Sequence, residues 1–172
     1  MADNYLEKRM EDYARGRLAG SKARLGRRSG VASVKYPAQG VAVVGAGDGR
    51  SRAVIRMLVE SGNRVAFTCP DSKTGTAMAQ ECGGRFYPTG AEAMAADLSA
   101  RGEGVDTVIC FTGTDKENCP AFSGARQYVF ITDGEVECDG IVLVGGTPEA
   151  VAMMVFAIVH PHVTLLQQTI RL

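Results

Sequence analysis

The segment VAVVGAGDGRSRAV, residues 41–54, is the part of this 172-residue chain that indicates its fold most clearly. Its first four residues are apolar without a break, as in a strand that is buried on both faces of a sheet. Glycines at 45, 47 and 49 then break the strand, and apolar side chains recur at helical spacing from residue 51. Such a turn favours a phosphate ligand, because glycine lets the backbone approach it and the helix start offers unpaired N–H groups. The same pattern also fits a tight turn that binds nothing.

Strand and helix patterns alternate through the rest of the chain, which predicts a parallel sheet with helices on both faces. The connection between the fourth and fifth strands has only about sixteen residues, so a crossover helix barely fits there. The fold class expected is therefore α/β, a doubly wound Rossmann-like, mostly parallel sheet, shortened in the middle, with ligands at the carboxyl ends of the strands. The strands are expected at residues 41–44, 65–68, 86–87, 107–111, 128–131, 141–144 and 169–172, and the helices at 51–61, 72–83, 91–101 and 147–159.

Charge divides the chain into two parts. Residues 1–40 hold nine basic and four acidic residues, whereas residues 41–172 hold ten basic and fifteen acidic ones. We therefore expect an N-terminal helix and a glycine-containing basic arm over residues 1–39, followed by a Rossmann-like domain over 40–172. The arm fits a solvated segment lying against the acidic body of its own or a neighbouring subunit better than a polyanion-binding segment.

Composition excludes several classes of function. The nineteen basic and nineteen acidic residues cancel, which gives no reason to expect nucleic acid as a partner. No apolar run reaches the roughly 20 residues that a bilayer span needs, so no membrane partner is expected. The five cysteines are odd in number and lack zinc-knuckle spacing, which predicts reduced thiols, no metal and a cytoplasmic protein. The two histidines, His160 and His162, flank Pro161 and fit a helix-ending turn.

Residues 40–172 resemble the short-chain dehydrogenase/reductase family. The family's turn, Thr-Gly-x-x-x-Gly-x-Gly, is matched at Gly45 and Gly49, and residues 147–152 and 168–172 resemble its late helix and final strand. The chain is identified as a degenerate, internally shortened member. The resemblance implies a Rossmann fold and a dinucleotide site, with these cofactor-binding candidates: Gly45, Gly47, Asp48, Gly49, Arg50, Ser51, Arg52 and Gly113.

The departures from the family pattern bear on the cofactor. Cys69 stands where NAD-dependent members carry an acid for the adenosine ribose, whereas Arg50, Arg52 and Lys73 can meet the additional phosphate of NADP. The resemblance therefore implies NADP rather than NAD, with binding that is weak or lost.

The family's catalytic Tyr-x-x-x-Lys pair is absent from the sequence, so no catalytic residue is assigned. A non-catalytic protein with a structural, regulatory or weak nucleotide-binding role is expected. Two alternatives stay open: an NAD(P)-dependent oxidoreductase using non-standard residues, and a phosphate-ester or nucleotide-sugar enzyme. Asp115 and Asp133 follow strands, but solvated loop acids explain them more simply. The absence of the Tyr-x-x-x-Lys pair follows from the positions of the five tyrosines. The residues four positions after them are Arg9, Arg17, Gly40, Ala91 and Thr132, and none of these is a lysine.

The C-terminal part of the chain predicts self-association. Residues 151–159 are apolar almost all round, although a helix that covers one sheet face needs only one apolar stripe. The final strand would also leave an exposed sheet edge. A two-fold dimer through this helix and strand satisfies both requirements. The open alternative is that the N-terminal helix covers residues 151–159 within one monomer.

Overall fold

The computed structural model describes residues 37–111, 119–134, 138–160 and 168–172. The chain divides into two compact units, Met1–Pro37 and Ala38–Leu172, and all that follows concerns the second. The N-terminal helix and basic arm expected from the sequence lie outside the described residues. So do Asp115 and the candidate site residue Gly113.

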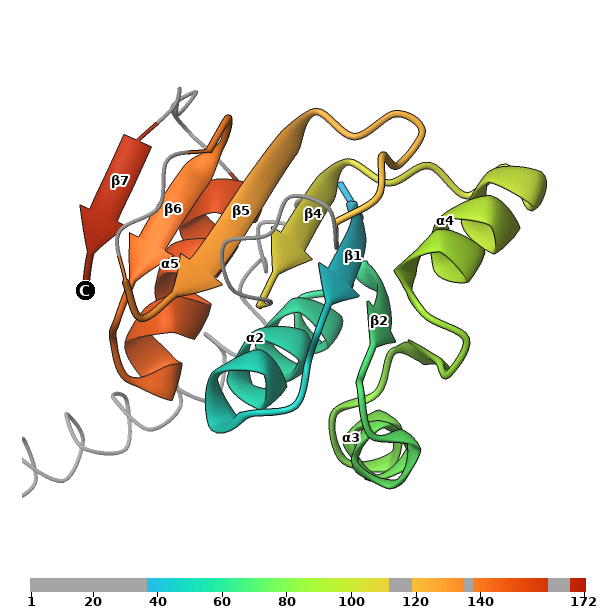
Figure 1. The fold of residues 1–172 in the computed structure, drawn as a ribbon, viewed down its shortest axis with the longest axis horizontal. Helices are drawn as coiled ribbons and strands as arrows, with labels where there is room; N and C mark the ends of the chain where they lie inside the picture. Colours follow the sequence, from blue (N-terminus) through green and yellow to red (C-terminus); the bar gives the residue numbers. More distant parts are fainter. Residues whose placement is uncertain (1–36, 112–118, 135–137, 161–167) are drawn as a thin grey trace, which may run out of the picture. The chain divides into compact units, whose positions relative to one another are not determined.

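The core of the unit is a seven-stranded sheet in the order β3-β2-β1-β4-β5-β6-β7, in which all six pairings are parallel. Figure 1 shows this sheet from β7 to β2. The order runs outward in both directions from β1 and β4, which is the doubly wound arrangement expected from the sequence. The carboxyl ends of all strands therefore lie at one edge of the sheet. The strands are β1 (Gly40–Val44), β2 (Arg64–Thr68), β3 (Arg85–Tyr87), β4 (Thr107–Cys110), β5 (Gln127–Thr132), β6 (Ile141–Val144) and β7 (Gln168–Arg171).

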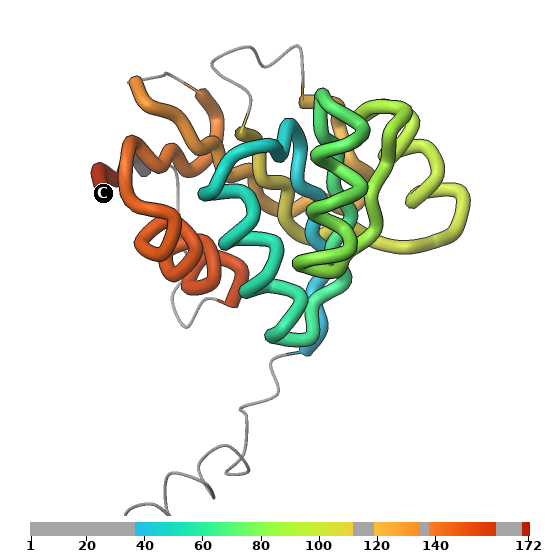
Figure 2. Tube along the Cα trace, turned by 90° about the horizontal axis from the view of Figure 1, so that it is seen from below, coloured from blue at the N-terminus to red at the C-terminus, as the bar shows by residue number. Residues whose placement is uncertain are grey.

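Helices cover the two faces of the sheet unequally. One apolar cluster joins α2, α3 and α5 to alternate residues of the strands, and these three helices lie in a row in Figure 2. A second, smaller cluster joins α4 to the opposite face of β1, β2 and β4. Both faces are thus buried at the centre, as the continuous apolar strands predict. The helices are α2 (Gly49–Glu60), α3 (Ser72–Cys82), α4 (Ala91–Ala100) and α5 (Pro148–Val159).

The shortening lies between β4 and β6. No helix is present in the described parts of the β4–β5 and β5–β6 connections. Phe122, from the first connection, instead places its side chain in the α4-side cluster. The same connection brings Cys119 back to the end of β4, where it forms a disulfide with Cys110. The expectation that all five cysteines are reduced is therefore wrong for this pair, because the short connection folds back on its own strand.

In the described part of the chain, no helix is long and apolar enough to cross a membrane.

Candidate functional site

The glycine-rich turn lies at the carboxyl edge of the sheet, between β1 and α2. Gly45 has a φ of +74°, a region that glycine tolerates without a steric penalty. Thr68, the last residue of β2, holds the turn from the side: its Oγ1 accepts a hydrogen bond from Gly45 N at 3.1 Å, and its carbonyl accepts one from Ala46 N at 2.8 Å. The turn is thereby fixed to two adjacent strands.

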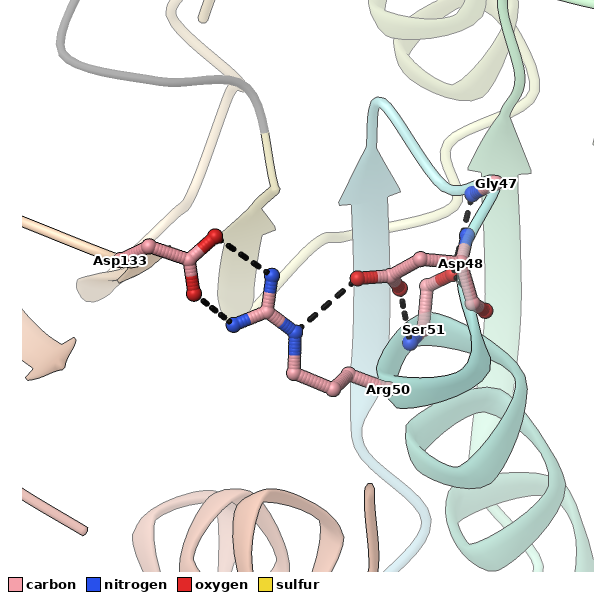
Figure 3. A network of polar contacts seen from close by, with 5 residues as sticks. All are labelled: Gly47, Asp48, Arg50, Ser51 and Asp133. Carbon is pink, nitrogen blue, oxygen red and sulfur yellow. Dashed lines mark hydrogen bonds and ion pairs between the residues drawn. The ribbon is translucent and has the colours of Figure 1, made fainter. Parts of the chain in front are cut away.

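Asp48 and Ser51 close the turn with reciprocal hydrogen bonds (Figure 3). Asp48 is the N-cap of α2, and its Oδ1 accepts a hydrogen bond from Ser51 N at 2.8 Å. The fully buried Ser51 returns the bond through Oγ, which accepts from Asp48 N at 3.1 Å and from Gly47 N at 2.9 Å. This is a capping box, a device that satisfies orphan donors at a helix start.

The capping box determines what the turn can bind. Three N–H groups at the start of α2, those of Gly47, Asp48 and Ser51, already donate to side chains of the turn itself. Partial burial alone would raise the pKa of Asp48, but hydrogen bonds from Ser51 and Arg50 outweigh it and hold that pKa below its usual value. A carboxylate therefore occupies the positive end of α2, where a phosphate would otherwise be stabilised.

Arg50 reaches from the start of α2 across the carboxyl edge of the sheet to β5. Its Nε donates to Asp48 Oδ2 at 3.0 Å, while Nη1 and Nη2 donate to the two carboxylate oxygens of Asp133 at 2.7 and 3.3 Å (Figure 3). Since β4 lies between β1 and β5, this ion pair spans the end of β4. The Asp133 hydrogen bond is the main reason that the pKa of Arg50 is raised.

Two of the basic residues expected to meet a cofactor phosphate form ion pairs with acids in this structure. Arg50 is paired with two carboxylates, and Arg52 Nη1 lies 3.4 Å from Glu81 Oε2 on α3. Lys73 lies exposed in the first turn of α3 and has no ion-pair partner among the described residues. The partnership of Arg50 with Asp133 was not predicted, because 83 residues separate the two in sequence and the link depends on strand order.

The remaining candidates shape the turn. A β-carbon built at Gly49 would lie 3.6 Å from Pro148 Cγ at the start of α5, so this glycine marks where α2 and α5 approach. A β-carbon at Gly47 would lie 3.9 Å from Cys69 Sγ, which places the buried Cys69 directly beside the turn. The structure thus brings Gly45, Gly47, Asp48, Gly49, Arg50 and Ser51 together, whereas the Arg52 side chain is directed to α3.

The hydroxyls of the two described tyrosines form hydrogen bonds within the domain. Tyr87 donates to Asp97 on α4 at 2.6 Å, and Tyr128 Oη accepts a hydrogen bond from Phe122 N at 3.3 Å. Both hydroxyls thus join parts of the fold to each other. Within the described residues, no group of three or more His, Cys, Asp or Glu side chains is placed to hold a metal ion.

Comparison with known proteins shows the fold. No family model matches the sequence, and no curated protein matches it. Solved structures do match: a ribose-5-phosphate isomerase from Brucella melitensis 16M has a TM-score of 0.64 and 15% identity, over 82% of this chain and 93% of that one.

Short-chain dehydrogenases/reductases also match. A metagenomic short-chain oxidoreductase in complex with NADP has a TM-score of 0.55 and 15% identity, over 78% of this chain and 96% of that one. The type-2 3-hydroxyacyl-CoA dehydrogenase from Mycobacterium avium has a TM-score of 0.59 and 12% identity, over 82% and 96%. The chain therefore has the Rossmann-like α/β fold that the short-chain dehydrogenases/reductases share, as its resemblance to that family predicted.

Proposed function

We propose that this chain is a non-catalytic Rossmann module with a structural or regulatory role, in which dinucleotide binding is weak or lost. The observation that carries the proposal is the Asp48–Ser51 capping box. It occupies three N–H groups of the glycine-rich turn and sets a carboxylate at the helix start. A pyrophosphate that approached these three groups would compete with the side chains of Ser51 and Asp48 and would meet a like charge, and both cost binding free energy.

The sequence supports the non-catalytic part of the proposal. None of its five tyrosines has a lysine four residues on, so no phenol is paired with the cation that would lower its pKa at one helical turn. Nothing in residues 40–172 resembles the family's catalytic Tyr-x-x-x-Lys pair. The described parts of the connections after β4 and β5 also contain no helix on which such a pair could stand.

Any residual binding should favour NADP over NAD. One structural neighbour, a metagenomic short-chain oxidoreductase, was solved in complex with NADP, so NADP is the cofactor to test first on this fold. At the end of β2, the buried Cys69 provides no carboxylate for a ribose diol, and Lys73, four residues on, provides an ammonium group for an added phosphate. Of Arg50, Arg52 and Lys73, the three residues expected to meet the added phosphate, we therefore propose that Lys73 supplies the discrimination.

We propose that the module works in the cytoplasm as a homodimer through α5 and β7. On α5, Met153 is 66% exposed, although the helix buries Val151, Val155 and Ile158 against its own domain. In the described sheet, β7 pairs with β6 on one side only. An exposed methionine and an edge strand are both features that self-association would cover.

Two measurements test the functional proposal. Isothermal calorimetry with NADP and NAD should give no heat, or a weak NADP signal that a Lys73→Ala variant loses. A panel of ketones and alcohols with both cofactors should give no turnover. Turnover near the usual enzyme median of roughly 10 per second, or NAD binding tighter than NADP binding, would overturn it in favour of an oxidoreductase with non-standard residues.

A further inference from the structure

Cys110 and Cys119 form a pair that stands apart from the other cysteines. Cys110 ends β4, Cys119 lies in the connection to β5, and their Sγ atoms are joined with the Cα atoms 6.8 Å apart. Cys69, Cys82 and Cys138 are buried thiols outside this bond. Of the five cysteines in the sequence, the fold thus selects two for oxidation.

The two sulfurs differ in how accessible they are. Cys110 is 1% exposed, on the α4-side face of the central strand β4, whereas Cys119 is only half-buried. Thiol–disulfide exchange requires an attacking thiolate to reach a sulfur. An external reagent therefore meets Cys119 first, and Cys110 is placed to react only with Cys119.

The disulfide holds a segment with few other attachments. Besides the disulfide, residues 119–126 connect to the sheet through the buried Phe122 side chain and the partly buried Ala125, the bond from Phe122 N to Tyr128 Oη, and the bond from Arg126 N to Asp106 O at 2.9 Å. A parallel crossover usually carries a helix that packs along the sheet. Here residues 119–126 contain no helix, and the covalent link stands at their beginning.

We propose that Cys110–Cys119 is a reversible redox modification site that fixes residues 119–126 on the sheet when oxidised and releases them when reduced. To form it, the Cys119 thiolate attacks one sulfur of a small disulfide such as oxidised glutathione, expelling one small thiol and giving a mixed disulfide. The Cys110 thiolate then attacks the Cys119 sulfur and expels the second small thiol. The two cysteines lose two electrons and two protons, and the small disulfide gains both. This proposal is independent of dinucleotide binding.

Thiol counting across a series of glutathione buffers tests the proposal on the full chain. After acid quenching, denaturation and alkylation with iodoacetamide, intact mass should show three labelled thiols under oxidising conditions and all five under reducing ones. Cys82→Ser, the matched control, should keep the difference of two labels, and Cys119→Ser should abolish it. Five labels in every buffer would overturn the disulfide, and three labels in every buffer would overturn its reversibility.

Hydrogen exchange supplies the second readout. In the wild-type chain, amides of residues 119–126 should exchange faster after reduction, while those of the buried strand β1 change little. The Cys119→Ser variant should match the reduced wild type in every buffer, and Cys82→Ser should respond as the wild type does. Equal exchange of residues 119–126 in oxidised and reduced wild type would overturn the proposed release.

Discussion

Asn63 Nδ2 lies 3.0 Å from His160 Nε2 in the interior of the domain, where both residues are less than 10% exposed. Asn63 Oδ1 accepts a hydrogen bond from Gln39 N, which fixes the amide so that Nδ2 is the donor toward His160. Nε2 must therefore be the acceptor, and the ring is neutral with its proton on Nδ1. This contact joins the α2–β2 connection to the end of α5, 97 residues away.

The Asn63–His160 contact predicts that stability falls as pH falls. Burial lowers the pKa of His160 from its ordinary value of 6.5, so the unfolded chain binds a proton there before the folded one does. Stability is then fully present above pH 6.5 and is lost as pH falls toward the folded-state pKa. Urea unfolding at pH 7.5 and 5.5 should show the loss. His160→Gln should reduce this loss, and an unchanged pH dependence in the variant would contradict the assignment.

Removing the side-chain amide of Asn63 should destabilise the domain more than the loss of so small a group suggests. Asn63→Ala removes the hydrogen-bond acceptor of Gln39 N, the side-chain donor to His160 Nε2 and one of the two donors to Leu58 O, which keeps the backbone N–H of residue 63. A buried polar group without a partner costs about 1–3 kcal/mol, so a loss of at least about 2 kcal/mol is expected. Gln80→Ala, at an exposed position of α3, is the control and should change stability by less than about 0.5 kcal/mol. Similar midpoints in urea for the two variants would contradict the role of Asn63.

The sequence predicted the sheet well because apolar runs and helix caps are local signals. The runs at β1, β4 and β6 and the Thr147 cap of α5 lie within a residue or two of where they were expected. A short loop after residue 111 also predicted that the middle of the fold is cut down. These strands are recognisable in the sequence because a parallel sheet that is buried on both faces tolerates few polar residues.

The contacts of the candidate site could not be predicted in the same way. Arg50 meets Asp133, and Cys110 meets Cys119, only because strand order and a short return loop place them together. The glycine-rich turn matched a phosphate-binding pattern, yet its Asp48 and Ser51 satisfy the turn internally. Spacing alone does not distinguish a donor that awaits a ligand from one that already has a partner.

Gly40 is a position where backbone approach, rather than turn geometry, requires glycine. A β-carbon there would overlap the carbonyl oxygen of Gly104, while one built at Gly104 would meet nothing within 4 Å. Gly40→Ala should therefore cost about 1–3 kcal/mol through a forced backbone shift, and Gly104→Ala should be nearly neutral. Thermal or urea unfolding of the two variants side by side checks this. Equal stability would show that the β1–β4 approach relaxes freely.

Neutralising Asp48 should strengthen dinucleotide binding if its charge is what weakens it. Asn is as good an N-cap as Asp, so Asp48→Asn keeps the bond from Ser51 N and removes the carboxylate from the helix start. The helix-end effect predicts about two- to fivefold tighter NADP binding. Asp97→Asn removes a similar charge on α4 and should leave binding unchanged. No gain in Asp48→Asn would mean that the charge of Asp48 is not the obstacle.

A charge on the exposed side of α5 should prevent self-association. Met153 is the large apolar side chain most exposed in the described chain, and its neighbours Val151 and Val155 are buried, so Met153→Glu leaves the domain core untouched. If α5 and β7 form a two-fold contact, the substitution places two glutamates near the axis, where like charges and desolvation both oppose association. Sedimentation velocity at micromolar concentration should show a dimer for the wild type and a monomer for Met153→Glu. Ala96→Glu, at an exposed position of α4, should remain dimeric. A wild-type chain that sediments as a monomer, or a Met153→Glu variant that remains a dimer, would rule out this surface.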